Sequence, residues 1–135
     1  MQIDQMDETL IKAVLETIPA EITVIDANDE VAGWNKHETR IFKRPWSCVG
    51  LNFRGCHPAS SLSKVIQIVD GMKAGTRDRA RFWIDVAVSP GEPKQKLLIE
   101  FYALRDPAGK YLGCLECMQD VEDIRRLEGE KRLLD

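Results

Sequence analysis

A strong period-2 alternation over positions 79–88 constrains this chain more than any other feature of its sequence. Every second residue of the run is apolar: Ala80, Phe82, Ile84, Val86 and Val88. The residues between them point to the opposite face, because successive strand side chains alternate. Residues 96–104 repeat the pattern after a loop at 89–93, and residues 111–119 follow a turn at 106–109. The sequence therefore predicts three consecutive antiparallel strands with one apolar face to bury.

The N-terminal half predicts a helix and a hairpin. Asp7 is a good N-cap residue, and the apolar residues after it recur at helical spacing up to Ile18. The β-branched run 21–25 and the run 31–35 flank a turn of Asp, Asn and Glu, which predicts two paired strands. A short helix is expected over residues 37–42.

A long amphipathic helix is predicted between Ser60 or Ser61, either of which can cap it, and Gly75, which suits its end. Its apolar face is expected to pack on the sheet and comprises Leu62, Val65, Ile66, Val69 and Met72. Asp120 can cap a last helix.

This order of elements predicts an α+β fold: a five-stranded antiparallel sheet with helices on one face, plus N-terminal and C-terminal helices. We divide the chain into an N-terminal helix (1–20), a core (21–119) and a C-terminal signalling helix (120–135).

Length and charge narrow the possible functions. The chain has 135 residues and a net charge of −3, with a hydrophobic fraction of 44%, as expected for one ordinary globular domain. The acidic balance argues against binding to nucleic acid or an anionic membrane, since both need a basic face. The first ten residues do not resemble a signal peptide, and no apolar run is long enough for a membrane span. We therefore expect a cytoplasmic protein whose four cysteines are free thiols.

The order of elements resembles the PAS fold, and five short motifs strengthen this resemblance. They are Asp26–Val31 followed by Asn35, Val49–Phe53, His57-Pro58, Asp106–Gly113, and Gln119-Asp120-Val121. The last motif is similar to the junction that couples the sheet of PAS domains to their output helix. Glu122 stands where that junction usually has a threonine.

More narrowly, the runs Gly55–Pro58, Phe82–Ile84 and Leu127–Leu134 resemble a PAS subfamily. Its members lie at the C-terminus of bacterial and archaeal proteins that also carry hemerythrin-like domains. The resemblance implies a sensory module that binds a small ligand or a partner, including other signalling domains, and relays a conformational signal through its C-terminal helix. Candidate pocket residues are Phe53, Cys56, His57, Ile66, Phe82, Ile84 and Phe101. Candidate relay residues are Asp120, Ile124 and Leu127.

Cys56 and His57 leave the cofactor undecided. Imidazole and thiolate both bind iron, which allows a haem-based redox or gas sensor. Two observations favour a structural role instead, in which His57 bonds to backbone groups over the core. Haem-binding relatives carry their histidine in the long helix, and residues 61–74 contain none; a proline after His57 also suits a helix start. Flavin-binding relatives need a cysteine directly after Asn52, where this chain has Phe53.

The sequence predicts no catalytic residues and no metal site. Ser61 and Lys64 match the S-x-x-K motif of penicillin-recognising enzymes, but the accompanying S-D-N and K-T-G motifs are missing. Cys114 and Cys117 have C-x-x-C spacing but fall in a predicted strand, where residues three apart point to opposite faces. We therefore expect that the protein is not an enzyme.

A homodimer is also predicted. The N-terminal helix has a broad apolar stripe, and a second apolar group lies on the face of the sheet that the central helices do not cover. That group comprises Trp83, Leu98, Tyr102 and Leu104. A dimerisation module with a filled core and no ligand is therefore the alternative to a ligand-binding sensor.

Overall fold

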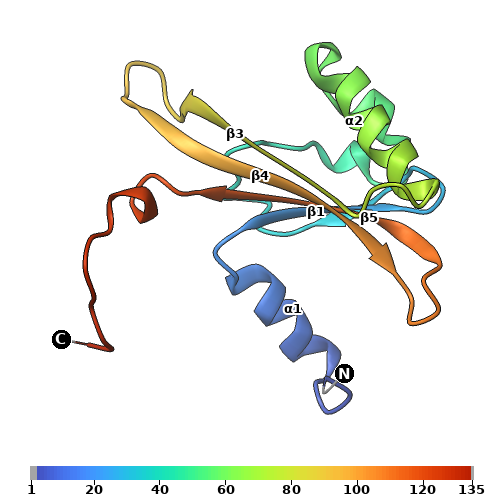
Figure 1. Cartoon of the computed structure of the whole chain (residues 1–135), viewed down its shortest axis with the longest axis horizontal. Coiled ribbons are helices and arrows are strands. Elements are labelled where there is room, and N and C mark those ends of the chain that lie inside the picture. Colours follow the sequence, from blue (N-terminus) through green and yellow to red (C-terminus); the bar gives the residue numbers. More distant parts are fainter. Residues whose placement is uncertain (1–2, 135) are drawn as a thin grey trace.

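The structure, a computed structural model, describes residues 3–134, which fold around one five-stranded antiparallel sheet (Figure 1). The strands are β1 (Glu21–Asp26), β2 (Val31–Trp34), β3 (Arg79–Ala87), β4 (Lys94–Arg105) and β5 (Tyr111–Asp120). Their order in the sheet is β2-β1-β5-β4-β3. The N-terminal hairpin therefore pairs with the last strand of the three-stranded meander, and the α+β sheet predicted from the sequence is confirmed.

The strand register defines two faces of this sheet. One row of cross-strand neighbours runs through all five strands and comprises Ala80, Phe101, Glu116, Thr23 and Trp34. We call the face with this row the inner face, because Phe101 belongs to the hydrophobic core. Trp83, Leu98 and Tyr102 lie on the other, outer face. Cys114 falls on the inner face and Cys117 on the outer one, as expected for residues three apart.

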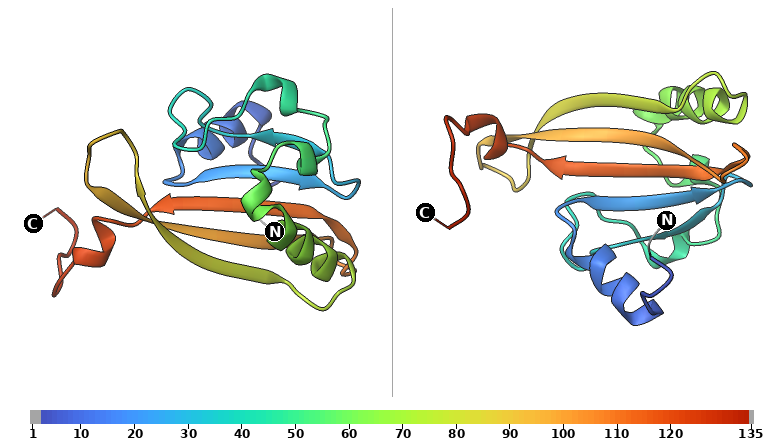
Figure 2. Two further views of the ribbon diagram at one scale, coloured as in Figure 1. Left: turned by 90° about the horizontal axis from the view of Figure 1, so that it is seen from above. Right: turned by 60° about the horizontal axis from the view of Figure 1, so that its bottom comes forward.

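Two α-helices lie on opposite sides of the sheet (Figure 2). α1 (Glu8–Thr17) begins at Asp7, whose carboxylate accepts the amide hydrogen of Leu10 at 2.8 Å. Leu15 of α1 shares a surface groove with Ile22 and Val24 on the outer face. α2 (Ala59–Lys73) covers one end of the inner face.

The packing of α2 differs in part from the predicted one. Its buried side chains are Val65, Ile68, Val69 and Met72. Leu62 and Ile66 are only half-buried, and Ile68 was missing from the predicted face. Pro58 occupies the N-cap position without a side-chain cap, so neither Ser60 nor Ser61 has the predicted capping role.

Two predicted helices need correction. Residues 37–42 form turns rather than a helix, and His37 stacks on Trp46 with 3.7 Å between the ring centroids. The expected helix over 120–135 is reduced to one 3-10 turn, η3 (Ile124–Arg126). Residues 127–134 are exposed, so no tertiary packing supports a helix there, and Gly129 has a φ of 61°. Residues 1, 2 and 135 of the predicted terminal regions lie outside the described part of the chain.

Gly113 allows β1 and β5 to approach each other closely. Its φ is 155°, and a Cβ atom at this position would overlap the carbonyl oxygen of Ile25. Among residues 3–134, no helix is both long and apolar enough to cross a bilayer.

Candidate functional site

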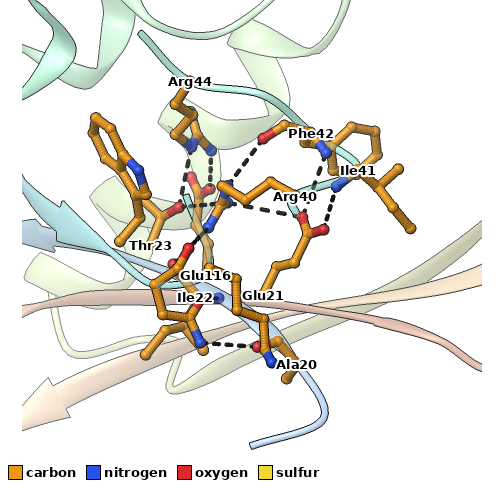
Figure 3. A network of polar contacts seen from close by, with 12 residues as sticks. Ala20, Glu21, Ile22, Thr23, Arg40, Ile41, Phe42, Arg44 and Glu116 are labelled. Carbon is orange, nitrogen blue, oxygen red and sulfur yellow. Dashed lines mark hydrogen bonds and ion pairs between the residues drawn. The ribbon is translucent and has the colours of Figure 1, made fainter. Parts of the chain in front are cut away.

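A network of buried polar side chains lies over the inner face, beside the apolar core (Figure 3). Its members come from four parts of the chain: β1, the segment after β2, the residues before α2, and β5. They are Glu21, Thr23, Asn35, Arg40, Arg44, His57 and Glu116. Charged groups are rarely buried unless they are paired, and here each one has partners.

Glu116, in the middle of β5, binds a nitrogen at each carboxylate oxygen. Oε1 lies 2.8 Å from Nε2 of His57, and Oε2 lies 2.8 Å from a guanidinium nitrogen of Arg44. All three side chains are buried, with at most 12% of their surface exposed. This triad connects β5 to the residues before α2 and to the segment after β2.

Both ring nitrogens of His57 face hydrogen-bond acceptors. Nε2 faces Glu116, and Nδ1 lies 3.0 Å from the carbonyl oxygen of Phe53. Only the doubly protonated ring can donate to both. Burial by itself would lower the pKa of His57, but the hydrogen bond and charge of Glu116, helped by the Phe53 carbonyl, raise it overall. The folded structure therefore favours the charged ring more than water does.

Thr23 joins the triad to Arg40. Its hydroxyl oxygen accepts from Nε of Arg44 at 3.0 Å and from Arg40 at 3.1 Å. Arg40 also donates to the carbonyl oxygens of Ile22, Asn35 and Phe42. Burial lowers the pKa of Arg40, and Glu21 opposes this effect. Glu21 in turn accepts the amide hydrogens of Ile41 and Phe42.

Asn35 extends the network to α1 on the other side of the sheet. Its amide group donates to the carbonyl oxygens of Leu15, at 2.6 Å, and Ala20, at 3.0 Å. Its side-chain oxygen accepts the amide hydrogen of Ile22 at 2.7 Å. The asparagine that the PAS resemblance singled out at the end of β2 therefore anchors the C-terminal part of α1.

The predicted pocket residues divide into a buried group and an exposed group. Phe53 and Phe101 are almost fully buried, whereas Phe82 and Ile84 are 38% and 36% exposed, although they share the inner face with Phe101. The rings of Phe82 and Phe101 stack with 5.9 Å between their centroids. Ile66 is half-buried at the edge of α2.

Cys56 and His57 both make protein contacts that a haem would have to replace. Burial, together with a hydrogen bond to the Cys48 thiol, raises the pKa of Cys56 to about 11, so the sulfur is a protonated thiol at neutral pH. Iron would have to displace this proton to bind the sulfur as thiolate. Both nitrogens of His57 are already engaged, by Glu116 and by the Phe53 carbonyl. A haem ligand at His57 would require both the triad and the Phe53 contact to be rearranged.

The C-terminal junction forms a second group of polar contacts. Asp120 accepts the amide hydrogen of Glu122 at 3.0 Å, and the Glu122 carboxylate pairs with Arg125 and Arg126. The hydrogen bond from Arg125 is the main cause that lowers the pKa of Glu122 to about 2. Of the other predicted relay residues, Ile124 and Leu127 are exposed.

The sequence reasoning missed most of the network. The sequence points to two of its members, His57 and Asn35, but not to Glu116, Arg40 or Arg44. Glu116 gave one usable signal, because it alternates with Cys114 and Met118 on the inner face of β5.

Comparisons with known proteins agree with the PAS resemblance. The family model described as PAS domain matches residues 11–122. The structure is similar to the C-terminal domain of a Streptococcus mutans protein, with a TM-score of 0.78 and 28% identity over 89% of each chain. It is also similar to the PAS domain of Bordetella pertussis BvgS, with a TM-score of 0.59 and 13% identity over 87% of this chain and 91% of that one.

Vibrio cholerae VqmA, solved as a complex with a ligand and DNA, gives a TM-score of 0.58 and 16% identity. That match covers 91% of this chain and 59% of the VqmA chain. Among curated proteins, none matches the sequence significantly.

Proposed function

This chain belongs to the PAS domain family, and we propose that it is a sensory module that binds a small, mainly apolar molecule on the inner face of its sheet. Binding there would bias the C-terminal junction and so signal to an attached domain or a partner protein. The VqmA complex, in which a related fold accompanies a ligand and DNA, supports a ligand-responsive role.

The observation that carries this proposal is the uncovered part of the inner face. α2 covers only one end of the sheet (Figure 2), which leaves Phe82 and Ile84 partly exposed beside the buried Phe101. Exposed apolar side chains that lie together beside the core are a common feature of ligand-binding grooves. A small ligand that stacks on Phe82 would complete the core at this point.

The polar network borders this surface. Glu116 is the direct neighbour of Phe101 across β4 and β5, so the Glu116–His57 pair lies next to the stacked phenylalanine rings. Small-molecule sites combine apolar walls with a few fixed polar groups. The proposed site has both.

Glu122 provides a route from the sheet to the C-terminal relay residues Asp120, Ile124 and Leu127. Its carboxylate accepts the amide hydrogen of Lys96 on β4, and the amide of Val121 donates to the carbonyl of the same residue. A change in β4 caused by a ligand would therefore reach the segment after β5 directly.

The test is native mass spectrometry of protein purified from cells, followed by identification of any released molecule. We expect a bound mass that is lost in Phe82→Ala and kept in Trp83→Ala. Trp83 is the matched control because it follows Phe82 in β3 but lies on the outer face. Absence of any bound mass, together with no binding in a small-molecule screen, would contradict the ligand proposal.

A dimerisation role is the second candidate, supported by exposed apolar groups at two places. Leu10 and Val14 of α1 are 51% and 43% exposed. On the outer face, Trp83 is 64% exposed and borders a groove of about 520 Å³ that also includes Leu98 and Ile124.

The occupant we propose for this groove is α1 of a second copy of the chain. The N-terminal region of α1 carries Asp7 and Glu8, whereas Arg81, Lys96 and Arg125 line the groove. Sedimentation equilibrium should show a dimer that is weakened in Trp83→Glu and Leu10→Glu and retained in Phe82→Ala. A monomer at about 100 μM would rule out any dimer of that affinity or tighter.

Three further proposals concern the catalytic activity, the cellular location and the subfamily of this domain. We propose that the domain has no catalytic activity of its own, because every buried ionisable side chain of the network is engaged in structural contacts. We propose a cytoplasmic location, supported by four free cysteines in a small domain. We also propose membership of the PAS subfamily that accompanies hemerythrin-like domains, on the Cys56-His57-Pro58 and Phe82-Trp83-Ile84 runs.

A further inference from the structure

We propose that His57 and Glu116 form a proton-dependent latch: protonated His57 ties the residues before α2 to β5, and loss of this proton releases them. What the latch would regulate rests on the proposed sensory function, because the pair borders the inner-face site. The latch itself depends only on the geometry around His57.

A neutral imidazole ring at this position has one N–H donor too few for the two acceptors that face it. Phe53 presents a carbonyl oxygen 3.0 Å from Nδ1, and Glu116 presents a carboxylate oxygen 2.8 Å from Nε2. A neutral ring carries a single N–H, so one nitrogen lone pair would face an oxygen lone pair. The side chains of His57 and Glu116 are only 9% and 11% exposed, so water has little access to bridge the unpaired groups.

The charged groups that face His57 come from β5 and from the segment after β2. Glu116 on β5 favours protonation of the ring, and Arg44 opposes it. Arg44 is bound to the other oxygen of Glu116 at 2.8 Å and to Thr23, so it stays with the carboxylate when His57 becomes neutral. The favourable change on deprotonation is therefore movement of His57 and not of Glu116.

Movement of His57 would reach α2 without an intervening flexible segment. Pro58, the next residue, is the N-cap of α2, and the ring of His57 packs edge-on against the ring of buried Phe53. Before His57, the amide of Cys56 donates to the carbonyl of Phe53 at 2.9 Å. Release of the latch should therefore loosen the turn at residues 53–56 and the first turn of α2.

Two NMR measurements on the intact chain test this proposal. The chain has only two histidines, so the ring ¹⁵N signals of His57 can be assigned with the His37→Gln variant. We expect a His57 ring with both nitrogens protonated at neutral pH. Its titration should coincide with a fall in the hydrogen-exchange protection factors of Gly55 and Cys56, after correction for the intrinsic effect of pH on exchange.

The Glu116→Gln variant should lower the midpoint of the His57 titration by about one pH unit or more, as expected when a close opposite charge is removed. The wild-type titration decides the question even if this variant fails to fold. The latch would be overturned if the His57 ring carried a single proton at neutral pH. It would also be overturned if the protection factors of residues 55 and 56 did not change as His57 titrates.

The two proposals fail separately. If the His57 titration and the loosening coincide but no molecule is bound, the latch stands and the ligand proposal fails. If a ligand is bound through Phe82 but His57 keeps one proton at neutral pH, the ligand proposal stands and the latch fails.

Discussion

The carboxylate of Glu122 accepts the backbone amide hydrogen of Lys96 at 2.8 Å and so ties the residues after β5 to β4. Glu122 stands where the corresponding junction of PAS domains usually has a threonine. In this chain the longer carboxylate makes a bond to β4 and also binds Arg125 and Arg126.

Substitutions at Glu122 should separate these contacts. Glu122→Ala removes the acceptor, so the Lys96 amide should exchange with solvent markedly faster in hydrogen-exchange NMR. Glu122→Gln keeps an acceptor oxygen and should leave that exchange close to the wild-type rate. Glu128→Ala, at an exposed position in the same segment, is the control. If the Lys96 amide hydrogen exchanged at the same rate in all three variants, its hydrogen bond to Glu122 would not be what holds the junction to β4.

Glu116→Ala should destabilise the fold by about 3–5 kcal/mol, because it leaves Arg44 and His57 buried without their carboxylate. Asp85→Ala is the control on β3. Asp85 lies on the outer face, where its side chain is 56% exposed and pairs with Lys96 at 2.7 Å, so its loss should cost about 1 kcal/mol or less. Urea denaturation measures both, and similar losses in the two variants would contradict the structure.

The pH dependence of stability should reveal His57. Its pKa is raised in the folded state, so its contribution is fully present below the ordinary value of 6.5 and is lost as the pH rises through the raised value. The stability difference between wild type and His57→Gln should therefore be largest in mildly acidic solution and shrink above neutral pH. A difference that grows with pH would have the wrong sign.

Two adjacent residues of α2 should respond differently to the same change. Val65 is buried against the core, whereas Ile66 is half-buried. Val65→Ser should cost a few kcal/mol, since it removes buried apolar surface and adds a hydroxyl without a partner. Ile66→Ser should cost clearly less. If Ile66 were the more sensitive position, the orientation of α2 would be wrong.

Gly113→Ala should destabilise the domain by about 2 kcal/mol or more, because the added Cβ overlaps the Ile25 carbonyl oxygen and the backbone has a φ of 155°. Gly33→Ala in β2 is the control, since no atom lies within 4 Å of its added Cβ. We expect this control to be neutral or slightly stabilising in thermal denaturation.

The sheet could be predicted from the sequence because its strands carry their own pattern. The alternation at 79–88 predicted β3 almost to the residue, since a period of two specifies a strand without reference to the rest of the chain. The helix expected over 120–135 failed for the opposite reason. A short, mainly charged segment is only marginally helical in water unless tertiary packing supports it, and residues 127–134 are exposed.

The polar network was harder to predict. Arg40 and Arg44 lie in a segment without periodicity, so no local pattern shows that their side chains turn inward. Their partners, Thr23 and Glu116, are 17 to 72 positions away and meet them only through the β1–β5 pairing. His57 was expected to bond to backbone groups, and its contact with Phe53 has that form. That its other partner is the carboxylate of Glu116 could be identified only from the three-dimensional structure.

The segment between β2 and η1 (Trp46–Cys48) has no regular secondary structure, yet Arg40 and Arg44 reach from it into the core. The segment therefore cannot be treated as an exchangeable connector in protein engineering. A chimaera that imports the segment from another PAS domain would need both arginines, or would also have to replace Thr23 and Glu116. We therefore expect domain-swapping experiments to tolerate exchange of the exposed β3–β4 loop far better than exchange of residues 35–45.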